Sequence, residues 1–279
     1  MAKILLIGCG KLGSAIAFSL HDAGHDVIGV RKSNKPLVNG IETIQADVGC
    51  LESLEVLKSV CPQIVIYCVA AAAQNDESYY QHYVVGLKNI LETLHASTQL
   101  EHVFFVSSTR VYGESIQGLV DEDVTAVASD YGGNRLLEAE QLLLKLKCAH
   151  TVLRLSGIYG PERLHLLKLA KDVGRWPEEN NWTNRIHQDD AVAFISCLVK
   201  LHVSGRQLAP CYIVTDGSSV QQYEVLAWLA KKQGIDVGRM GWPSVCKGKR
   251  LDNAKMKSLG FKLKYPTYQD GYEAVLASL

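Results

Sequence analysis

The sequence predicts an α/β protein built on a doubly wound parallel sheet, followed by a smaller, loop-rich lobe. Three observations predict this fold class. Short, continuously apolar runs alternate with helical periodicity through the first half of the 279 residues, as expected when helices cover both faces of a parallel sheet. A glycine-rich turn joins the first apolar run to the first helical segment. After about residue 158 the rhythm loosens into a stretch that holds two Trp, two Pro and mixed charge.

The apolar runs and the helical periods place the elements along the chain. We expect strands at residues 4–7 (ILLI), 27–30 (VIGV), 64–69 (IVIYCV), 103–107 (VFFVS) and 151–155 (TVLRL). Helices are expected between them at 11–22, 51–59, 79–95 and 131–147. Further along, a strand at 211–214 rejoins the sheet, and helices follow at 221–233 and 253–259. This order predicts a main domain over residues 1–158, with 185–217 rejoining it, and a lobe over 159–184 and 218–279.

Charge, the length of apolar runs and the spacing of cysteines exclude several classes of protein. The 29 basic and 29 acidic residues give a formal net charge of zero, so we expect no nucleic acid as the main partner. The apolar runs are shorter than the roughly 18 to 20 residues of a membrane helix, and we expect no export segment before the first strand. The eight cysteines form no C-x-x-C pair. We interpret them as reduced, buried thiols of a cytoplasmic protein without a metal site.

The residues IGCGKLGSA, at the junction of the first strand and the first helix, indicate a dinucleotide-binding turn. Gly8 permits the tight turn, Gly10 lets the main chain approach a pyrophosphate, and Gly13 lets the helix press against the strand. The amides of Lys11 and Leu12, at the helix start, are expected to face the phosphates. The main domain is therefore predicted to be a Rossmann dinucleotide-binding domain, which leaves the lobe for the substrate.

The end of the second strand decides which nicotinamide cofactor is expected. An acid at this place accepts the adenosine ribose hydroxyls, whereas a base receives a 2′-phosphate. The chain offers Arg31 and Lys32, and no acid occurs from residue 27 to residue 40. We therefore predict NADP(H). NAD is the alternative, because a solvated basic pair at a strand end is also common.

A second group of candidate residues follows the fourth strand. The residues FFVSSTRVYG cover 104–113, and YGGNRLLEAE covers 131–140. Tyr131 and Arg135 stand four residues apart and share a helix face. A neighbouring cation favours the phenolate of a tyrosine, so Tyr131 is the expected acid and base, while Ser108 donates a hydrogen bond to a substrate oxygen. Alone, such a Tyr and Arg pair is an ordinary surface contact; the glycine turn and the serine-rich strand end favour catalysis.

These motifs resemble the extended short-chain dehydrogenase/reductases, the NAD(P)-dependent epimerase/dehydratase family, over nearly the whole chain. The resemblance implies that Ser108, Tyr131 and Arg135 take the places of the catalytic Ser/Thr, Tyr and Lys. It also implies that further cofactor contacts come from Asp47, Val48, Val69, Ala70 and Ala71. Other matching stretches are YVVGLKNIL at 83–91, RLSGIYGPER at 154–163 and RIHQDDAV at 185–192.

Several departures separate the chain from the family pattern. The glycine spacing is GxGxxG instead of the usual GxxGxxG, and Tyr83 replaces the first Asn of the helix motif. Arg135 replaces Lys, and a guanidinium neither titrates near neutrality nor passes a proton. Ser108 is followed by Thr109 and Arg110, where dehydratases of the family carry an Asp-Glu pair. The resemblance therefore disfavours dehydration and leaves epimerase or reductase chemistry.

The acids of RIHQDDAV are interpreted as structural. Asp189 and Asp190 suit the positive end of a helix that begins near Gln188. We therefore expect no metal at His187.

The favoured function is that of an NAD(P)-dependent oxidoreductase or epimerase that acts on a hydroxyl or carbonyl group, with a nucleotide-linked sugar as the expected small-molecule substrate. Thr109 and Arg163 are further candidates for substrate contact. Arg135 in place of Lys motivates an alternative, an NADP(H)-binding sensor or regulatory protein with little or no activity. A hydroxyacid dehydrogenase would explain the glycine turn but not the two catalytic motifs. The sequence leaves the oligomeric state open. In the resembling family, counterparts of helices 79–95 and 131–147 pair two subunits, which makes a homodimer one candidate.

Overall fold

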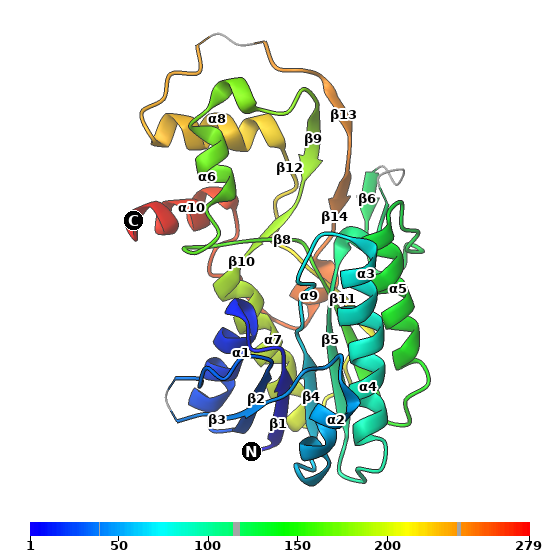
Figure 1. Cartoon of the computed structure of the whole chain (residues 1–279). Coiled ribbons are helices and arrows are strands. Elements are labelled where there is room, and N and C mark those ends of the chain that lie inside the picture. Colours follow the sequence, from blue (N-terminus) through cyan, green and yellow to red (C-terminus); the bar gives the residue numbers. More distant parts are fainter. Residues whose placement is uncertain (39, 114–117, 239–240) are drawn as a thin grey trace. The chain divides into compact units, whose positions relative to one another are not determined.

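The computed structural model describes residues 1–38, 40–113, 118–238 and 241–279 (Figure 1). The chain divides into two compact units. The first comprises Met1–Gly113, Ala126–Arg154 and Val192–Tyr212, and the second comprises Glu114–Thr125, Leu155–Ala191 and Ile213–Leu279. Because each unit draws on three segments, neither is one continuous stretch of chain.

A seven-stranded parallel sheet forms the centre of the first unit. Its strands lie in the order β11–β7–β5–β4–β1–β2–β3, and β1 pairs in parallel with both β2 and β4. Winding therefore reverses between β1 and β4, which is where open α/β sheets bind ligands. The strands are β1 (Lys3–Ile7), β2 (Asp26–Arg31), β3 (Glu42–Gln45), β4 (Ile64–Tyr67), β5 (His102–Ser108), β7 (Ala149–Leu155) and β11 (Cys211–Val214).

The predicted strands are confirmed, and one further strand, β3, was not predicted. Its residues, ETIQ, are partly or fully exposed, and it pairs with β2 at the edge of the sheet. An edge strand of this kind lacks the continuous apolar run that marks a strand buried on both faces. All four residues of β4, by contrast, are buried.

Helices cover both faces of the sheet, and Figure 1 shows α4 and α5 side by side on one face and α1 with α7 on the other. The hydroxyls of Ser19 in α1 and Ser196 in α7 hydrogen-bond at 2.9 Å. The helices and 3₁₀ turns are α1 (Lys11–Asp22), α2 (Leu51–Leu54), η1 (Glu55–Ser59), α4 (Gly86–Leu94), η3 (Thr109–Val111), α5 (Tyr131–Leu143) and α7 (Gln188–Val203).

The prediction of one continuous helix at 79–95 is wrong, because this stretch of chain forms three segments. These are α3 (Asp76–Tyr79), the π-helical turn η2 (Tyr80–Val85) and α4. The hydroxyl of Tyr67, at the end of β4, donates a hydrogen bond to the main-chain carbonyl of His82. A side chain that competes for a helical carbonyl in this way widens the turn. Gly86 makes the approach possible, since a Cβ there would lie 2.5 Å from the Tyr67 hydroxyl oxygen.

The prediction that the cysteines are buried is wrong for most of them. Cys9 is buried, Cys50 is exposed, and Cys61, Cys68, Cys148, Cys197 and Cys211 are partly exposed. The side chain of Cys246 lies outside the part of the structure that is described. Several of these cysteines stand at the ends of strands, where an apolar run in the sequence no longer implies full burial.

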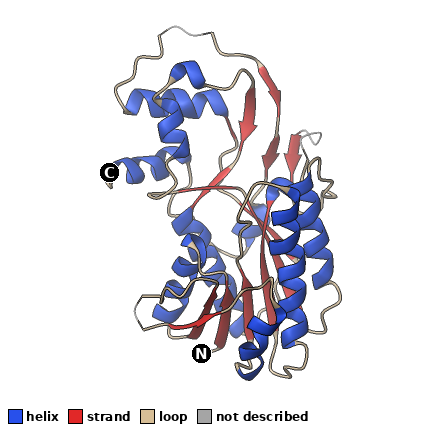
Figure 2. Ribbon diagram, viewed as in Figure 1, coloured by secondary structure: helices blue, strands red, loops and turns tan. Residues whose placement is uncertain are grey.

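The second unit holds three small sheets, which Figure 2 draws in red. They pair β10 with β8, β9 with β12 and β13, and β14 with β6. The strands are β6 (Gly118–Val120), β8 (Gly157–Tyr159), β9 (Asn180–Thr183), β10 (Arg185–His187), β12 (Val220–Gln221), β13 (Val245–Lys247) and β14 (Lys249–Leu251). None of these pairings was predicted, because strands of two to four residues carry almost no periodicity.

An apolar core holds the helices of the second unit together. Tyr159, Leu226, Leu229 and Tyr272 are among its buried members. The predicted helices at 221–233 and 253–259 are confirmed as α8 (Gln222–Lys232) and α9 (Ala254–Ser258), whereas α6 (His165–Ala170), η4 (Val173–Arg175) and α10 (Tyr268–Ala277) were not predicted. Among the residues of the described ranges, no helix is long and apolar enough to cross a membrane.

Candidate functional site

The glycine turn joins β1 to α1, and its three glycines differ in the space around them. Gly8 has φ +97°, and a Cβ there would lie 2.7 Å from the main chain of Cys68 and Val69. A Cβ at Gly13 would lie 2.2 Å from the Gly8 carbonyl oxygen, whereas Gly10 has nothing within 4 Å of its Cβ position. The missing side chains of Gly8 and Gly13 therefore allow the main chain to pack closely around the turn, whereas the space beside Gly10 is open.

The start of α1 offers main-chain amides to a ligand. Gly10 is the N-cap and no side chain caps the helix. Lys11 and Leu12 are the first two helical residues, and the amides of a first helical turn point along the helix axis toward its N-terminal end. Together with the open space at Gly10, these amides fit the pyrophosphate of a dinucleotide.

Arg31 and Lys32 lie at the carboxyl end of β2, as predicted. Lys32 Nζ pairs with the Asp47 carboxylate at 2.7 Å, and this hydrogen bond holds the pKa of Asp47 below its usual value. Arg31 donates from Nη1 to the Lys35 carbonyl at 3.0 Å. Its Nε is buried and has no hydrogen-bond partner among the residues described. A buried N–H group without a partner favours an anionic or polar ligand beside it.

Two helix side chains hold the predicted cofactor segments. Asn89 donates from Nδ2 to the Val48 carbonyl at 2.8 Å, which fixes the segment that follows β3. Tyr83, the residue that departs from the family's Asn, makes a hydrogen bond to the main chain of Ala71. Burial is the main reason why the pKa of Tyr83 rises to about 12, so this phenol stays neutral. Ala71 and its neighbours Val69 and Ala70 follow β4.

The predicted catalytic residues Ser108 and Tyr131 lie next to the starts of two segments of the first unit, η3 and α5. Ser108 ends β5, and its Oγ accepts from the Arg110 amide at 3.2 Å, which leaves its own proton for donation. Thr109, the first residue of η3, is buried. Tyr131 is the first residue of α5, whose N-cap Asp130 accepts from the Gly133 amide at 2.7 Å.

Arg135 lies in α5 one turn after Tyr131, but its guanidinium is bound elsewhere. It donates to the Asp76 carboxylate at 2.8 and 3.0 Å and to Glu138 at 2.8 Å, and it lies 4.8 Å from the ring centroid of Tyr80. The cation that the structure places over the Tyr131 ring is Arg110, at 5.1 Å. Tuning of Tyr131 by Arg135 therefore stays a prediction.

Sequence reasoning missed Arg110 as a site residue. Two signals were available: Arg110 stands directly in the SSTRVYG motif, and two glycines follow Tyr131 at the start of a helix. Glycines in a first helical turn are poor helix formers, so they indicate a close approach by another group.

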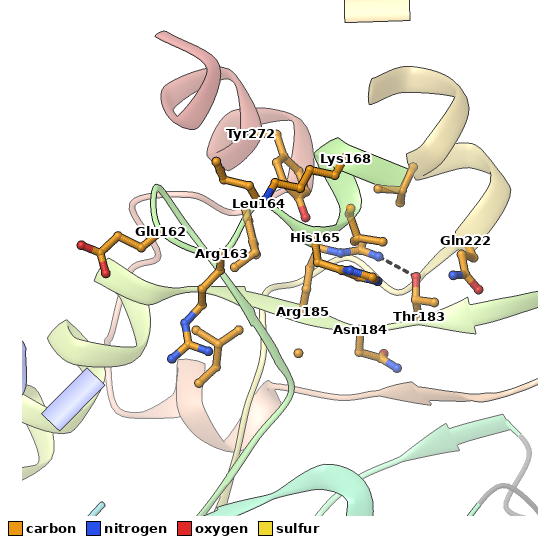
Figure 3. Close-up of a pocket in the computed structure, with 15 residues that line it drawn as sticks. Glu162, Arg163, Leu164, His165, Lys168, Thr183, Asn184, Arg185, Gln222 and Tyr272 are labelled. Atoms are coloured by element: carbon orange, nitrogen blue, oxygen red, sulfur yellow. Dashed lines mark hydrogen bonds between the residues drawn. The ribbon is translucent and has the colours of Figure 1, made fainter. Parts of the chain in front are cut away.

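A cavity of about 580 Å³ lies in the second unit (Figure 3). Its lining includes the basic residues Arg163, His165, Lys168 and Arg185 together with the carboxylate of Glu162. Figure 3 shows Glu162 directed away from His165 and Arg185. The predicted substrate residue Arg163 thus lines this cavity, and its Nε donates to the Gln188 side chain at 3.4 Å.

Arg185 is the most buried cation of the cavity, at 3% exposure. Its Nη2 donates to Thr183 Oγ1 at 2.5 Å, drawn as a dashed line in Figure 3, whereas its Nη1 is buried with no hydrogen-bond partner among the described residues. Burial raises the pKa of the nearby Asp216 to about 7, although the Ser218 amide and Arg185 oppose the rise. An incompletely paired, buried guanidinium favours an anion in the cavity.

The acids after His187 have structural contacts. Asp190 accepts hydrogen bonds from the amides of Lys264 and Tyr265 at 2.7 and 2.9 Å, and α7 begins at Gln188. In the described part of the chain, no group of three or more His, Cys, Asp or Glu residues could hold a metal ion.

Comparisons with known proteins identify the class to which this fold and site belong. Residues 4–208 match the model of the NAD dependent epimerase/dehydratase family. A solved structure from Methylobacillus flagellatus, whose name assigns it to the NAD-dependent epimerase/dehydratases, is 42% identical, with 99% of this chain and 98% of that chain covered and a TM-score of 0.90. The chain belongs to the NAD-dependent epimerase/dehydratase family, and it is an enzyme of the extended short-chain dehydrogenase/reductase type.

More distant structures share the fold. The Bordetella bronchiseptica enzyme WbmG, solved in complex with NAD and UDP, is 19% identical over 99% of this chain and 94% of that chain, with a TM-score of 0.80. The UDP-N-acetylglucosamine 4-epimerase from Bacillus cereus is 16% identical over 99% of both chains, with a TM-score of 0.76. A comparison with functionally curated proteins found no match. Family membership confirms the catalytic interpretation over the regulatory one and implies a nicotinamide dinucleotide as cofactor.

Proposed function

We propose that the protein is an NADP(H)-dependent reductase or epimerase that acts on a hydroxyl or carbonyl group of a nucleotide-linked sugar. The observation that carries the proposal is a shared sheet edge. The glycine turn follows β1, residues 69–71 follow β4, and Ser108 ends β5, and these strands are neighbours in one parallel sheet. Their carboxyl ends therefore present the cofactor turn and the catalytic hydroxyl at the same edge.

The roles of the residues follow from their chemistry. When bound, the nicotinamide takes up or delivers a hydride. Tyr131 moves the proton of the reacting hydroxyl, and Ser108, whose Oγ already accepts from the Arg110 amide, donates its proton to the reacting oxygen. Arg135, whose guanidinium is bound by Asp76 and Glu138 in the free protein, keeps its predicted role of holding the nicotinamide ribose as a proposal. Gly8, Gly10, Lys11, Leu12 and Gly13 hold the pyrophosphate.

Replacement of Tyr131 by Phe tests these roles. We expect most turnover to disappear while the affinity for the cofactor changes little, because the change removes one hydroxyl and leaves the glycine turn intact. Turnover is followed by NADPH absorbance with a panel of sugar nucleotides and carbonyl compounds. Unchanged turnover in Y131F would refute the assignment.

The preference for NADP(H) rests on the end of β2. Arg31 and Lys32 supply positive charge there, and the buried Arg31 Nε lacks a partner among the described residues. The pairing of Lys32 with Asp47 leaves Arg31 as the main 2′-phosphate ligand, with Asp47 and Val48 on the adenine side. The role of Arg31 is tested by measuring the dissociation constants of NADPH and NADH for the wild-type protein and for R31M. The wild type should prefer NADPH, and R31M should lose that preference. Equal constants in the wild type would overturn it.

The cavity of the second unit is proposed as the site for the phosphates of the substrate. Arg163 and Lys168 supply accessible charge, and Arg185 supplies a buried N–H group. Calorimetric titration with UDP and with uridine tests this assignment. UDP should bind and uridine should bind far more weakly, and K168M should weaken UDP binding with little effect on stability, because Lys168 is a surface residue of α6. Equal affinities for UDP and uridine would contradict it. Thr109, which is buried, is assigned to the positioning of the substrate from the side of η3.

Three further parts complete the proposal. The division into a dinucleotide-binding domain and a substrate lobe is proposed with the boundaries predicted from the sequence. Location in the cytoplasm is supported by the seven cysteines with described side chains, which form no disulfide with one another. A homodimer is supported by a hollow of about 560 Å³ on α4 and α5, whose lining includes Leu91, Leu142 and Leu146. Light scattering coupled to gel filtration measures the mass of the protein in solution and thereby tests the dimer.

A further inference from the structure

The guanidinium of Arg110 contacts three residues around the start of α5, namely Asp130, Tyr79 and Tyr131. Its Nε donates to both carboxylate oxygens of Asp130 at 3.0 and 2.8 Å, and its Nη1 donates to the Tyr79 hydroxyl at 2.8 Å. Its Cζ lies 5.1 Å from the ring centroid of Tyr131 and 5.0 Å from that of Tyr79. The two rings meet edge to face at 5.5 Å. The guanidinium is thus held on one side by a carboxylate and faces two phenols on the other.

The charge of Arg110 is retained in this position. Its side chain is 31% exposed. Partial burial lowers the pKa of Arg110, but the hydrogen bond with the Asp130 carboxylate and electrostatic interactions with Tyr79 and Tyr131 outweigh burial and raise it above its usual value. The contact with Tyr131 is therefore one between a permanent cation and the face of a phenol ring, which is attractive.

The glycines of the YGG motif have a steric reason that involves the same guanidinium. A Cβ at Gly132 would lie 2.5 Å from Arg110 Cζ and 2.6 Å from Nη1. A Cβ at Gly133 would lie 2.7 Å from the Arg110 carbonyl oxygen. Glycine lowers the stability of a helix. At these two positions it also allows close contact between Arg110 and α5, which a residue with a Cβ would prevent.

Arg110 also reaches the second catalytic hydroxyl, through its main chain. Its amide donates to Ser108 Oγ at 3.2 Å, so one residue holds the serine rotamer with its main chain and the tyrosine ring with its side chain. Arg135, by comparison, is bound by the carboxylates of Asp76 and Glu138 and thereby ties α5 to α3.

We propose that Arg110 is the positioning residue of the site: it aligns Ser108 and Tyr131 with each other, a task for which the family pattern would have pointed to residue 135. The inference rests on the proposed function for the roles of Ser108 and Tyr131, but the alignment itself is a property of the free protein. It accounts together for Arg110 after Ser108 and Thr109, for the glycine pair after Tyr131 and for the arginine at position 135.

The first test needs no substrate. The whole protein is labelled with ¹³Cζ-tyrosine, and Y131F identifies the Tyr131 signal. R110M and G132A should both move that signal, because one removes the cation and the other displaces it. R110K should restore part of the shift. R135M, which removes an arginine of the same helix, should leave the signal within its line width. Thermal unfolding of each variant checks that it folds.

Two results would overturn the proposal: a Tyr131 signal that stays in place in both R110M and G132A, or one that R135M moves more than R110M does. If R110M does not fold, G132A and R110K carry the test, because both keep a cation at or near the site.

The second test uses turnover, with whichever sugar nucleotide or carbonyl compound the wild type accepts. R110M should lower kcat at least about 100-fold with KM changed less than about threefold, and R110K should recover at least about tenfold, as expected for misalignment in the reacting state. A loss confined to KM would contradict positioning. If the wild type turns over no compound of the panel, the proposed function fails while the tyrosine signal still decides the role of Arg110.

Discussion

At the scale of single residues, the three glycines of the turn have separable tasks. Gly13 has no room for a side chain because its Cβ would lie 2.2 Å from the Gly8 carbonyl oxygen, whereas Gly10 has nothing within 4 Å. We expect G13A to lower the free energy of unfolding by about 1–3 kcal/mol, the usual cost of overpacking. G10A should change it by less than about 0.5 kcal/mol and yet weaken NADPH binding at least about tenfold, or about 1.4 kcal/mol.

Urea unfolding and fluorescence titration with NADPH measure the two effects on the same preparations. The assignment of Gly10 to the pyrophosphate fails if G10A binds NADPH as tightly as the wild type does. It also fails if G10A loses stability to the extent that G13A does.

His102 makes stability depend on pH. Its ring is buried, with Nε2 3.0 Å from Thr151 Oγ1 and the His202 ring centroid at 4.6 Å. Burial, followed by the charges of His202 and His150, lowers the pKa of His102 to about 3. An unfolded histidine titrates near 6.5, so between pH 6.5 and 3 the unfolded state binds more protons. The contribution of His102 to stability is therefore complete above pH 6.5 and is lost as the pH falls toward 3.

The predicted size of this effect follows from linkage. Between pH 7.5 and pH 5, His102 should account for a loss of about 2 kcal/mol in the free energy of unfolding. The asparagine variant H102N should show a correspondingly flatter dependence, and urea unfolding at the two pH values measures it. An identical slope in wild type and H102N would show that His102 is not responsible.

At the scale of elements, the interruption of the expected helix at 79–95 depends on one hydroxyl. Tyr67 donates to the His82 carbonyl, inside the π-helical turn η2. Y67F should lower the free energy of unfolding by about 0.5–1.5 kcal/mol and change amide hydrogen exchange over residues 80–85. G86A should be less harmful in the Y67F background than in the wild type, since the clash at 2.5 Å with the Tyr67 oxygen is absent there. Additive effects of Y67F and G86A would argue against this coupling.

Element boundaries show which parts of the site could be predicted. The first strand and the helix at 11–22 carry strong periodicity, and the structure places them as predicted. Tyr83 could be recognised only as a departure from the family pattern, because its bond to Ala71 joins residues twelve positions apart through a turn. The small strands β8 and β9, which supply Gly157, Thr183 and other lining residues of the cavity, had no signal in the sequence.

At the scale of the whole molecule, binding of the cofactor should raise stability. A ligand that binds only the native state at one hundred times its dissociation constant stabilises by about 2.7 kcal/mol. NADPH should therefore raise the midpoint of thermal unfolding of the wild type. At the same NADPH concentration, a tenfold weaker affinity limits the stabilisation of G10A to about 1.4 kcal/mol, so calorimetry should show a midpoint shift for G10A that is about half that of the wild type or smaller. Equal shifts in the two proteins would place the cofactor away from the glycine turn.

The parallel sheet, the glycine turn, the family and the candidate roles of Ser108 and Tyr131 could be predicted from the residues alone, because they depend on local periodicity and on motifs of contiguous residues. The cation that faces Tyr131 could be identified only from the folded chain. Arg110 and Arg135 both lie in or beside the catalytic motifs of the sequence, and Arg135 is in the same helix as Tyr131, α5. Asp76, fifty-nine positions before Arg135, binds the Arg135 guanidinium, and the missing side chain of Gly132 admits Arg110. Pairings across such separations follow from packing, which no local pattern encodes.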